Sequence, residues 1–144
     1  MKRLALLAVV ILLALGNPGA GRSDDQKFNH VSASDFKEWL QNGRELILVD
    51  IQPARKFSKH HFAGSIETNA FPVKSKDEQE LLTPALEAYQ ASGHEVVVIC
   101  PAGGGGAERA FTALNKKGIP HSKLFILTGG IKKWPYQELF AVTP

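Results

Sequence analysis

The chain contains one cysteine, Cys100, and its surroundings favour chemistry at sulfur. It follows the apolar run 96–99, which predicts a buried strand, and four consecutive glycines follow it at 103–106. Glycine permits positive φ angles and carries no Cβ, so neighbouring backbone N–H groups can converge on one anion. A helix predicted over 107–117 adds the partial positive charge of its first turn. The residues that we expect to form this cradle of backbone amides are Ala102, Gly103, Gly104, Gly105 and Gly106.

Other interpretations of this stretch fit its residues less well. Cys100 could be a small buried residue at a strand end, but a plain connection does not need four glycines, which raise the entropy cost of ordering the chain. A nucleotide-binding P-loop needs Lys followed by Ser or Thr after its glycines, and neither follows here. A cysteine-dependent phosphatase would need an arginine that closes the loop, and Gly106 occupies that position.

The elements that must position Cys100 alternate between strands and helices. Continuous apolar runs predict strands buried on both faces at 46–49, 96–99 and 124–127. Amphipathic or capped segments predict helices at 34–41, 53–60, 77–91, 107–117 and 131–140, with a break or kink at Pro84. This alternation predicts an α/β domain with a parallel sheet. Ligands bind such sheets at the carboxyl ends of the strands, where Cys100 lies.

Composition excludes several classes of protein. Hydrophobic residues make up 44% and charged residues 22% of the 144-residue chain, which is typical of a folded globular domain. One cysteine excludes an internal disulfide, a zinc ribbon and an iron–sulfur cluster. The five histidines have no metal-ligand spacing, so they predict no metal site. No long basic run points to a nucleic acid.

The first residues have the pattern of an export signal. Lys2 and Arg3 precede the apolar run 4–15, and small residues and turn formers follow it. As a helix the apolar run would span about 18 Å, short of the hydrocarbon core of about 30 Å. We therefore expect a signal peptide over 1–21, one mature domain over 22–144, and a periplasmic or secreted protein with no membrane span after cleavage. An uncleaved anchor is the alternative. Without Lys2 and Arg3 the formal net charge of +3 falls to +1.

Four motifs in this order resemble the rhodanese family of sulfurtransferases over residues 28–136. The strand at 48–51 carries Asp50 in the position of that family's strand aspartate. Phe57 and the segment 61–66 resemble the family's Phe and His-Ile-Pro-Gly-Ala stretch. Cys100 and the loop after it match the catalytic cysteine and its ring of amides, and residues 129–134 match the closing Gly-Gly and Trp element.

The resemblance implies a central five-stranded parallel sheet flanked by helices on both faces. It also implies that the Cys100 thiolate attacks the outer sulfur of a small donor such as thiosulfate, a persulfide or a polysulfide. The resulting persulfide then gives its sulfur to a thiophilic acceptor such as cyanide or a thiol, and the loop amides stabilise the negative charge. The alternative is a rhodanese fold without turnover that carries or senses sulfur or binds a protein.

Several positions depart from the family pattern. Gln52 stands in place of an arginine, Lys56 in place of a glutamate, and Ala63 in place of the proline. Residues 101–105 contain no cation, whereas many members hold the sulfonate of thiosulfate with one there, and Pro101 has no N–H to donate. We therefore expect weak activity with thiosulfate and better transfer from a persulfide, a polysulfide or another carrier of low charge.

Three further residues are predicted to support the site. Asp50 either positions the loop or a nearby arginine, or it caps the turn after its strand. His61 is expected to hold structure through a backbone hydrogen bond rather than to act as a base. Arg109 either faces the site or occupies a solvated or salt-bridged position on the helix. The lysine pair at 132–133 is expected to be a solvated surface pair.

Overall fold

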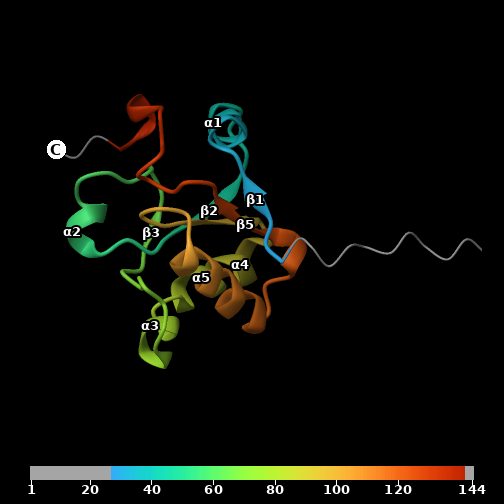
Figure 1. Cartoon of the computed structure of the whole chain (residues 1–144). Coiled ribbons are helices and arrows are strands. Elements are labelled where there is room, and N and C mark those ends of the chain that lie inside the picture. Colours follow the sequence, from blue (N-terminus) through green and yellow to red (C-terminus); the bar gives the residue numbers. More distant parts are fainter. Residues whose placement is uncertain (1–26, 142–144) are drawn as a thin grey trace, which may run out of the picture.

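A computed structural model describes residues 27–141, so the predicted signal peptide lies outside the described residues. The centre of the molecule is a sheet of five parallel strands (Figure 1). In spatial order they are β1 (His30–Val31), β5 (Leu124–Leu127), β4 (Glu95–Ile99), β2 (Leu46–Asp50) and β3 (Ile66–Glu67). The predicted α/β fold with a five-stranded parallel sheet is confirmed.

The neighbouring inner strands β2 and β4 pair along their whole length, and this pairing brings the ends of the two strands together. Leu46 pairs with Glu95 at one end of β2 and β4, and Asp50 pairs with Ile99 at the other. Because the strands are parallel, Asp50 and the residue after Ile99, Cys100, leave the sheet at the same carboxyl edge. Valine and isoleucine fill β4, whose residues from Val96 onward are fully buried because helices cover both faces.

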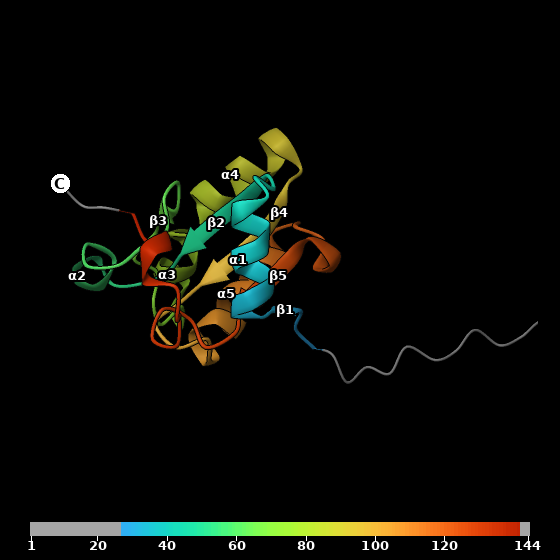
Figure 2. The same cartoon turned by 90° about the horizontal axis from the view of Figure 1, so that it is seen from above.

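Helices pack on both faces of the sheet (Figures 1 and 2). α1 (Ala33–Gln41) covers one face, where Phe36 is fully buried. Its N-cap is Ser32, whose side chain accepts a hydrogen bond from Asp35 N at 3.1 Å. α4 (Thr83–Ser92) and α5 (Gly105–Lys116) cover the other face, where Phe111 and Leu114 enter the core.

The helix predicted over 77–91 is two helices. α3 (Lys76–Glu80) ends before Leu82, and α4 begins at Thr83 with Pro84 in its first turn. Proline suits this position because the first helical N–H groups have no partner within the helix. Two neighbouring leucines at the break differ in burial, since Leu82 is fully buried and Leu81 is 45% exposed.

The prediction of a helix over 131–140 is wrong. Only a 3₁₀ turn, η2 (Gln137–Leu139), forms there. Pro135 restricts the residue before it to extended conformations, which ends any helix at Trp134. Trp134 is buried, and its indole N–H donates to Tyr136 O at 2.7 Å. The remaining short elements are α2 (Ala54–Phe57) and η1 (His121–Lys123).

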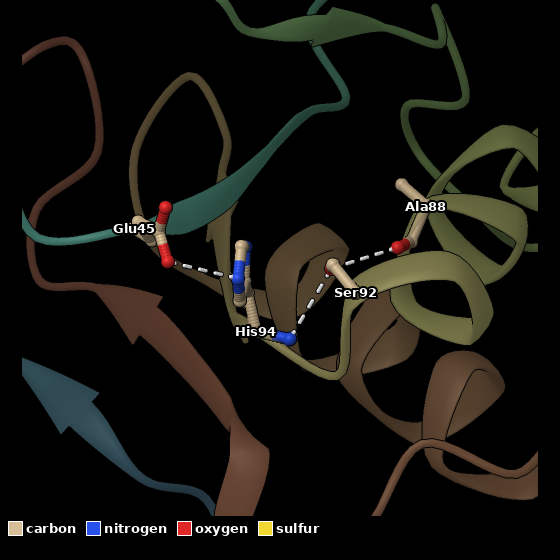
Figure 3. Close-up of polar contacts among 4 residues, drawn as sticks. All are labelled: Glu45, Ala88, Ser92 and His94. Atoms are coloured by element: carbon tan, nitrogen blue, oxygen red, sulfur yellow. Dashed lines mark hydrogen bonds and ion pairs between the residues drawn. The ribbon is translucent and has the colours of Figure 1, made fainter.

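The amino end of the sheet, opposite Cys100, is held by polar contacts of the turn between α4 and β4 (Figure 3). Ser92 Oγ donates to Ala88 O at 2.9 Å and accepts from His94 N at 3.3 Å. His94 Nε2 lies 3.1 Å from a carboxylate oxygen of Glu45, just before β2. These residues fix a structural turn at the edge of the sheet opposite Cys100. Within residues 27–141, no helix is long and apolar enough to cross a membrane.

Candidate active site

Cys100 lies at the carboxyl end of β4, 2% exposed, at the base of the glycine loop. The backbone N–H of Gly103 donates to Cys100 Sγ at 2.6 Å. This turn requires glycine, because residue 103 has a φ of +71° and a Cβ there would lie 2.6 Å from Gly129 N. The loop therefore aims a backbone donor at the sulfur.

The helix after the loop starts two residues earlier than predicted. Gly105 and Gly106 form the first turn of α5, and Gly104 is its N-cap residue. The first amides of a helix have no partner within the helix and carry its partial positive charge. The glycine run therefore has two parts, which are a tight turn at Gly103 that binds the sulfur and a helix N-terminus beside it.

A second glycine turn supports the loop from behind. Gly130 has a φ of +57°, and a Cβ there would lie 2.7 Å from Gly103 N and 2.8 Å from Ala102 N. Just after it, Ile131 N donates to Cys100 O at 3.0 Å. The two turns thus meet backbone against backbone, which fixes the position of the cysteine relative to its amides. The sequence identified this glycine pair as a family motif but gave no sign of the contact.

Asp50 caps the turn after β2, which is the second of its two predicted roles. It is fully buried, and its carboxylate oxygens accept from Gln52 N at 2.8 Å and from Gln52 Nε2 at 3.1 Å. Gln52 Nε2 also donates to His60 O at 2.9 Å. The glutamine that stands in place of the family's arginine therefore supplies the donors of the carboxylate. Burial raises the pKa of Asp50 from 3.8 to about 6, and the hydrogen bonds from Gln52 offset only part of this rise.

This raised pKa makes the stability of the domain depend on pH. Asp50 keeps its proton up to about pH 6 in the folded protein but only up to about pH 3.8 in the unfolded chain. Its contribution to stability is therefore fully present below pH 3.8 and is lost as the pH rises through 6. Between pH 4 and 7 the free energy of unfolding of the wild type should fall by on the order of 2–3 kcal/mol relative to that of Asp50→Asn. Urea unfolding of both proteins across this range measures the difference. Parallel pH curves for the two proteins would contradict the raised pKa.

His61 and Arg109 lie at the borders of the site. His61 Nδ1 is 2.8 Å from Phe57 O, and the two rings stack at 4.1 Å. A carbonyl only accepts, so Nδ1 carries the proton, and the structural hydrogen bond expected of His61 is present. Arg109 Nε donates to Pro72 O at 2.8 Å, and a Cβ on Gly105 would lie 2.9 Å from Arg109 Nη1. The guanidinium thus lies against one of the predicted cradle residues.

Phe71 borders the site and was not identified from the sequence. Its ring is 40% exposed, and a Cβ on Gly106 would lie 2.9 Å from it. The flanking residues Asn69 and Val73 have φ angles of +56° and +59°, which are unusual for residues other than glycine. Phe71 N donates to Ile51 O at 2.9 Å, which ties this turn to the end of β2. The segment has no periodicity that could have revealed its position.

A cleft of about 350 Å³ opens beside the loop at Pro101 and Ala102. Three lysines line it, Lys56, Lys59 and Lys132, and we call it the lysine cleft. Of the described residues that line it, none is acidic. Lys132 and Lys133 are both exposed, as the sequence predicted, and Lys132 also lines this cleft.

The profile of the rhodanese-like domain matches residues 32–136. The chain belongs to the rhodanese-like domain family. The tRNA uridine(34) hydroxylase of Bordetella parapertussis is 30% identical to this rhodanese-like protein over 122 residues. That alignment covers 81% of the chain and 44% of the hydroxylase, so the chain spans less than half of this relative's length.

Solved structures share the fold at low sequence identity. An As-Sb reductase from Leishmania major has a TM-score of 0.62 at 16% identity, covering 81% of this chain and 87% of that one. A Saccharomyces cerevisiae protein, described as a homologue of single-domain rhodanese and the Cdc25 phosphatase catalytic domain, has a TM-score of 0.62 at 17% identity, with coverages of 79% and 86%. A rhodanese-related protein from Thermoplasma volcanium has a TM-score of 0.55 at 20% identity, with coverages of 81% and 98%. In the described part of this rhodanese-like chain, no three His, Cys, Asp or Glu side chains are grouped to hold a metal.

Proposed function

We propose that this rhodanese-like protein is a sulfurtransferase that carries sulfane sulfur on Cys100. The observation that carries the proposal is the hydrogen bond from Gly103 N to Cys100 Sγ at 2.6 Å, beside the N-terminus of α5. A sulfur-centred anion at this point is stabilised by backbone dipoles that are already oriented, so no reorganisation is needed as charge moves between sulfur atoms. The same donors serve the thiolate before transfer and the persulfide after it.

The proposed reaction has two displacements at sulfur. The Cys100 thiolate attacks the outer sulfur of a donor R–S–SH, a new S–S bond forms on Cys100, and R–S⁻ leaves with the electron pair of the broken bond. A thiolate or cyanide then attacks the outer sulfur of the Cys100 persulfide and restores the Cys100 thiolate. Sulfur and electrons balance without an external oxidant, a metal or an organic cofactor.

A carrier or sensor without turnover is the second candidate, and the burial of Cys100 favours it. A sulfur atom in a side chain that is only 2% exposed is difficult for a bulky acceptor to reach. The two candidates differ in the second displacement. An enzyme releases sulfur to an added acceptor over many cycles, whereas a carrier gains one sulfur atom and keeps it.

We also propose that the protein acts outside the cytoplasm, in the periplasm or after secretion. This proposal is supported only by the sequence pattern of residues 1–21.

Intact mass spectrometry tests the proposed function directly. The reduced protein is mixed with thiosulfate or with an organic persulfide and is measured before and after cyanide is added. We expect a gain of one sulfur atom, mapped to Cys100 by peptide mass, and its loss to cyanide. If no donor adds sulfur to the folded, reduced protein, the sulfurtransferase proposal is wrong.

The missing cation of the loop gives a further prediction. Gly105 starts α5 and its φ is not positive, so a side chain there is compatible with the backbone. A Cβ would meet only the flexible end of Arg109 at 2.9 Å. Gly105→Arg should raise kcat/KM with thiosulfate by about tenfold to a hundredfold, because a charge-assisted hydrogen bond contributes about 1–3 kcal/mol. Gly105→Ala is the steric control. If alanine preserves activity and arginine gives no gain, the missing cation does not limit thiosulfate use.

A further inference from the structure

The lysine cleft is joined rigidly to the loop that holds Cys100. Lys132 N donates to Pro101 O at 2.9 Å, so the backbone of this lysine is tied to the residue that follows the cysteine. The other two lysines come from one segment, in which Lys59 N donates to Lys56 O at 3.1 Å in the turn that ends α2. Gln52, which binds both Asp50 and His60 O, connects that segment to the end of β2. Backbone contacts thus hold the cleft at a fixed place beside the cradle.

The lysines of the cleft supply positive charge, which the side chains of the loop lack. The loop offers backbone dipoles but no cationic side chain among residues 101–105. Three lysines line the cleft, and none of the described residues that line it is acidic. The surface of the cleft itself is mostly apolar, so it suits a ligand with an aliphatic part whose charged groups reach the lysine ammonium groups. Its 350 Å³ lies within the range of about 300–1,000 Å³ typical of sites for small organic ligands.

The position of the positive charge selects between classes of donor. In thiosulfate the sulfonate is bonded directly to the outer sulfur, so both groups occupy the cradle when that sulfur contacts Cys100. The lysines line a cleft that includes Pro101 and Ala102 of the loop but neither Cys100 nor any of the four glycines. They suit a donor whose negative charges are separated from its reacting sulfur by several bonds.

We propose that the lysine cleft binds the carboxylates of a low-molecular-weight organic persulfide whose sulfane sulfur is transferred to Cys100. This inference rests on the proposed sulfurtransferase function and specifies its donor. The carboxylates pair with Lys56, Lys59 and Lys132, and the persulfide extends past Ala102 into the cradle. Cys100 takes the outer sulfur, and the carboxylated thiolate R–S⁻ leaves through the same cleft.

The test compares two donors that differ in charge. Glutathione persulfide carries carboxylates remote from its sulfur, and 2-mercaptoethanol persulfide carries none. The rate of sulfur addition to Cys100 is measured by mass for the wild type and for the triple variant Lys56→Gln, Lys59→Gln, Lys132→Gln. We expect the triple variant to react roughly tenfold or more slowly with glutathione persulfide. Its rate with the donor that has no carboxylate should change by less than about twofold, because the two donors share the charge of the persulfide group itself.

A matched variant controls for the change in net charge. Lys76→Gln, Lys123→Gln and Lys133→Gln remove the same charge from lysines that do not line the cleft, and this protein should react with both donors as the wild type does. Equal rates for the wild type and the cleft variant with glutathione persulfide, or an equal loss with both donors, would overturn the cleft assignment. Sulfur addition to wild-type Cys100 in the same experiment would still support the transferase. If the wild type gains sulfur from neither donor, the proposed function fails, and the cleft assignment fails with it.

Discussion

Cys100→Ser should abolish the gain of sulfur from every donor while leaving the fold intact. A serine hydroxyl does not ionise to a nucleophilic anion near neutral pH, and no described neighbour is placed to act as its base. The rate of sulfur transfer should therefore fall by at least about a thousandfold. The serine hydroxyl can still accept the hydrogen bond from Gly103 N, which keeps the loop closed. Intact mass after incubation with a persulfide measures the loss.

The control for this prediction is the stability of the variant. Its urea unfolding midpoint should stay near that of the wild type, because serine is close to cysteine in size and the site is polar on its loop side. A folded serine variant that still gains sulfur would place the acceptor atom elsewhere in the chain and would contradict the role of Cys100.

Gly130→Ala should produce the largest loss of stability of any single methyl addition to the site. A Cβ there would overlap Cys100 O and would lie 2.7 Å from Gly103 N, and both are backbone atoms that cannot move aside. The φ of +57° adds the cost of a left-handed conformation. We expect a decrease of about 3 kcal/mol or more in the free energy of unfolding. Urea denaturation measures it, and sulfur transfer should fall as well because the loop is displaced.

Gly93→Ala separates the overlap from the backbone conformation. Gly93 ends α4 with a φ of +69°, and a Cβ there would meet nothing within 4 Å. Gly93→Ala should lower the free energy of unfolding by only about 1–2 kcal/mol, which is the cost of the left-handed conformation alone. If the two variants lost equal stability, the contact between the two glycine turns would not be a structural requirement.

The fold could be predicted because its central strands are simple. The continuous apolar runs at β2, β4 and β5 match strands that are covered on both faces, and the helices between them leave a parallel sheet as the fitting arrangement. The prediction was wrong where a local pattern competed with proline. Residues 131–140 have helical spacing, but Pro135 and the burial of Trp134 give a turn instead.

The site could be predicted only as far as it is local in sequence. Cys100 and its glycines are consecutive, so their chemistry follows from the residue types alone. The contact with Gly130, the ring of Phe71 against Gly106, and the lysine cleft all join segments that are distant in sequence. Their positions depend on how far each turn extends from the sheet edge, which no short pattern encodes.

The burial of Cys100 limits which other molecules can reach its sulfur atom. A thiol that is 2% exposed at the base of a closed loop cannot approach the thiol of a second molecule closely enough to form an intermolecular disulfide. The single cysteine is therefore protected from covalent dimerisation even in an oxidising compartment. Once the persulfide has formed, its terminal atom lies one bond further out than Sγ. In the proposed reaction a small acceptor would therefore reach the transferred sulfur more easily than Sγ, whereas the same burial still hinders a bulky acceptor.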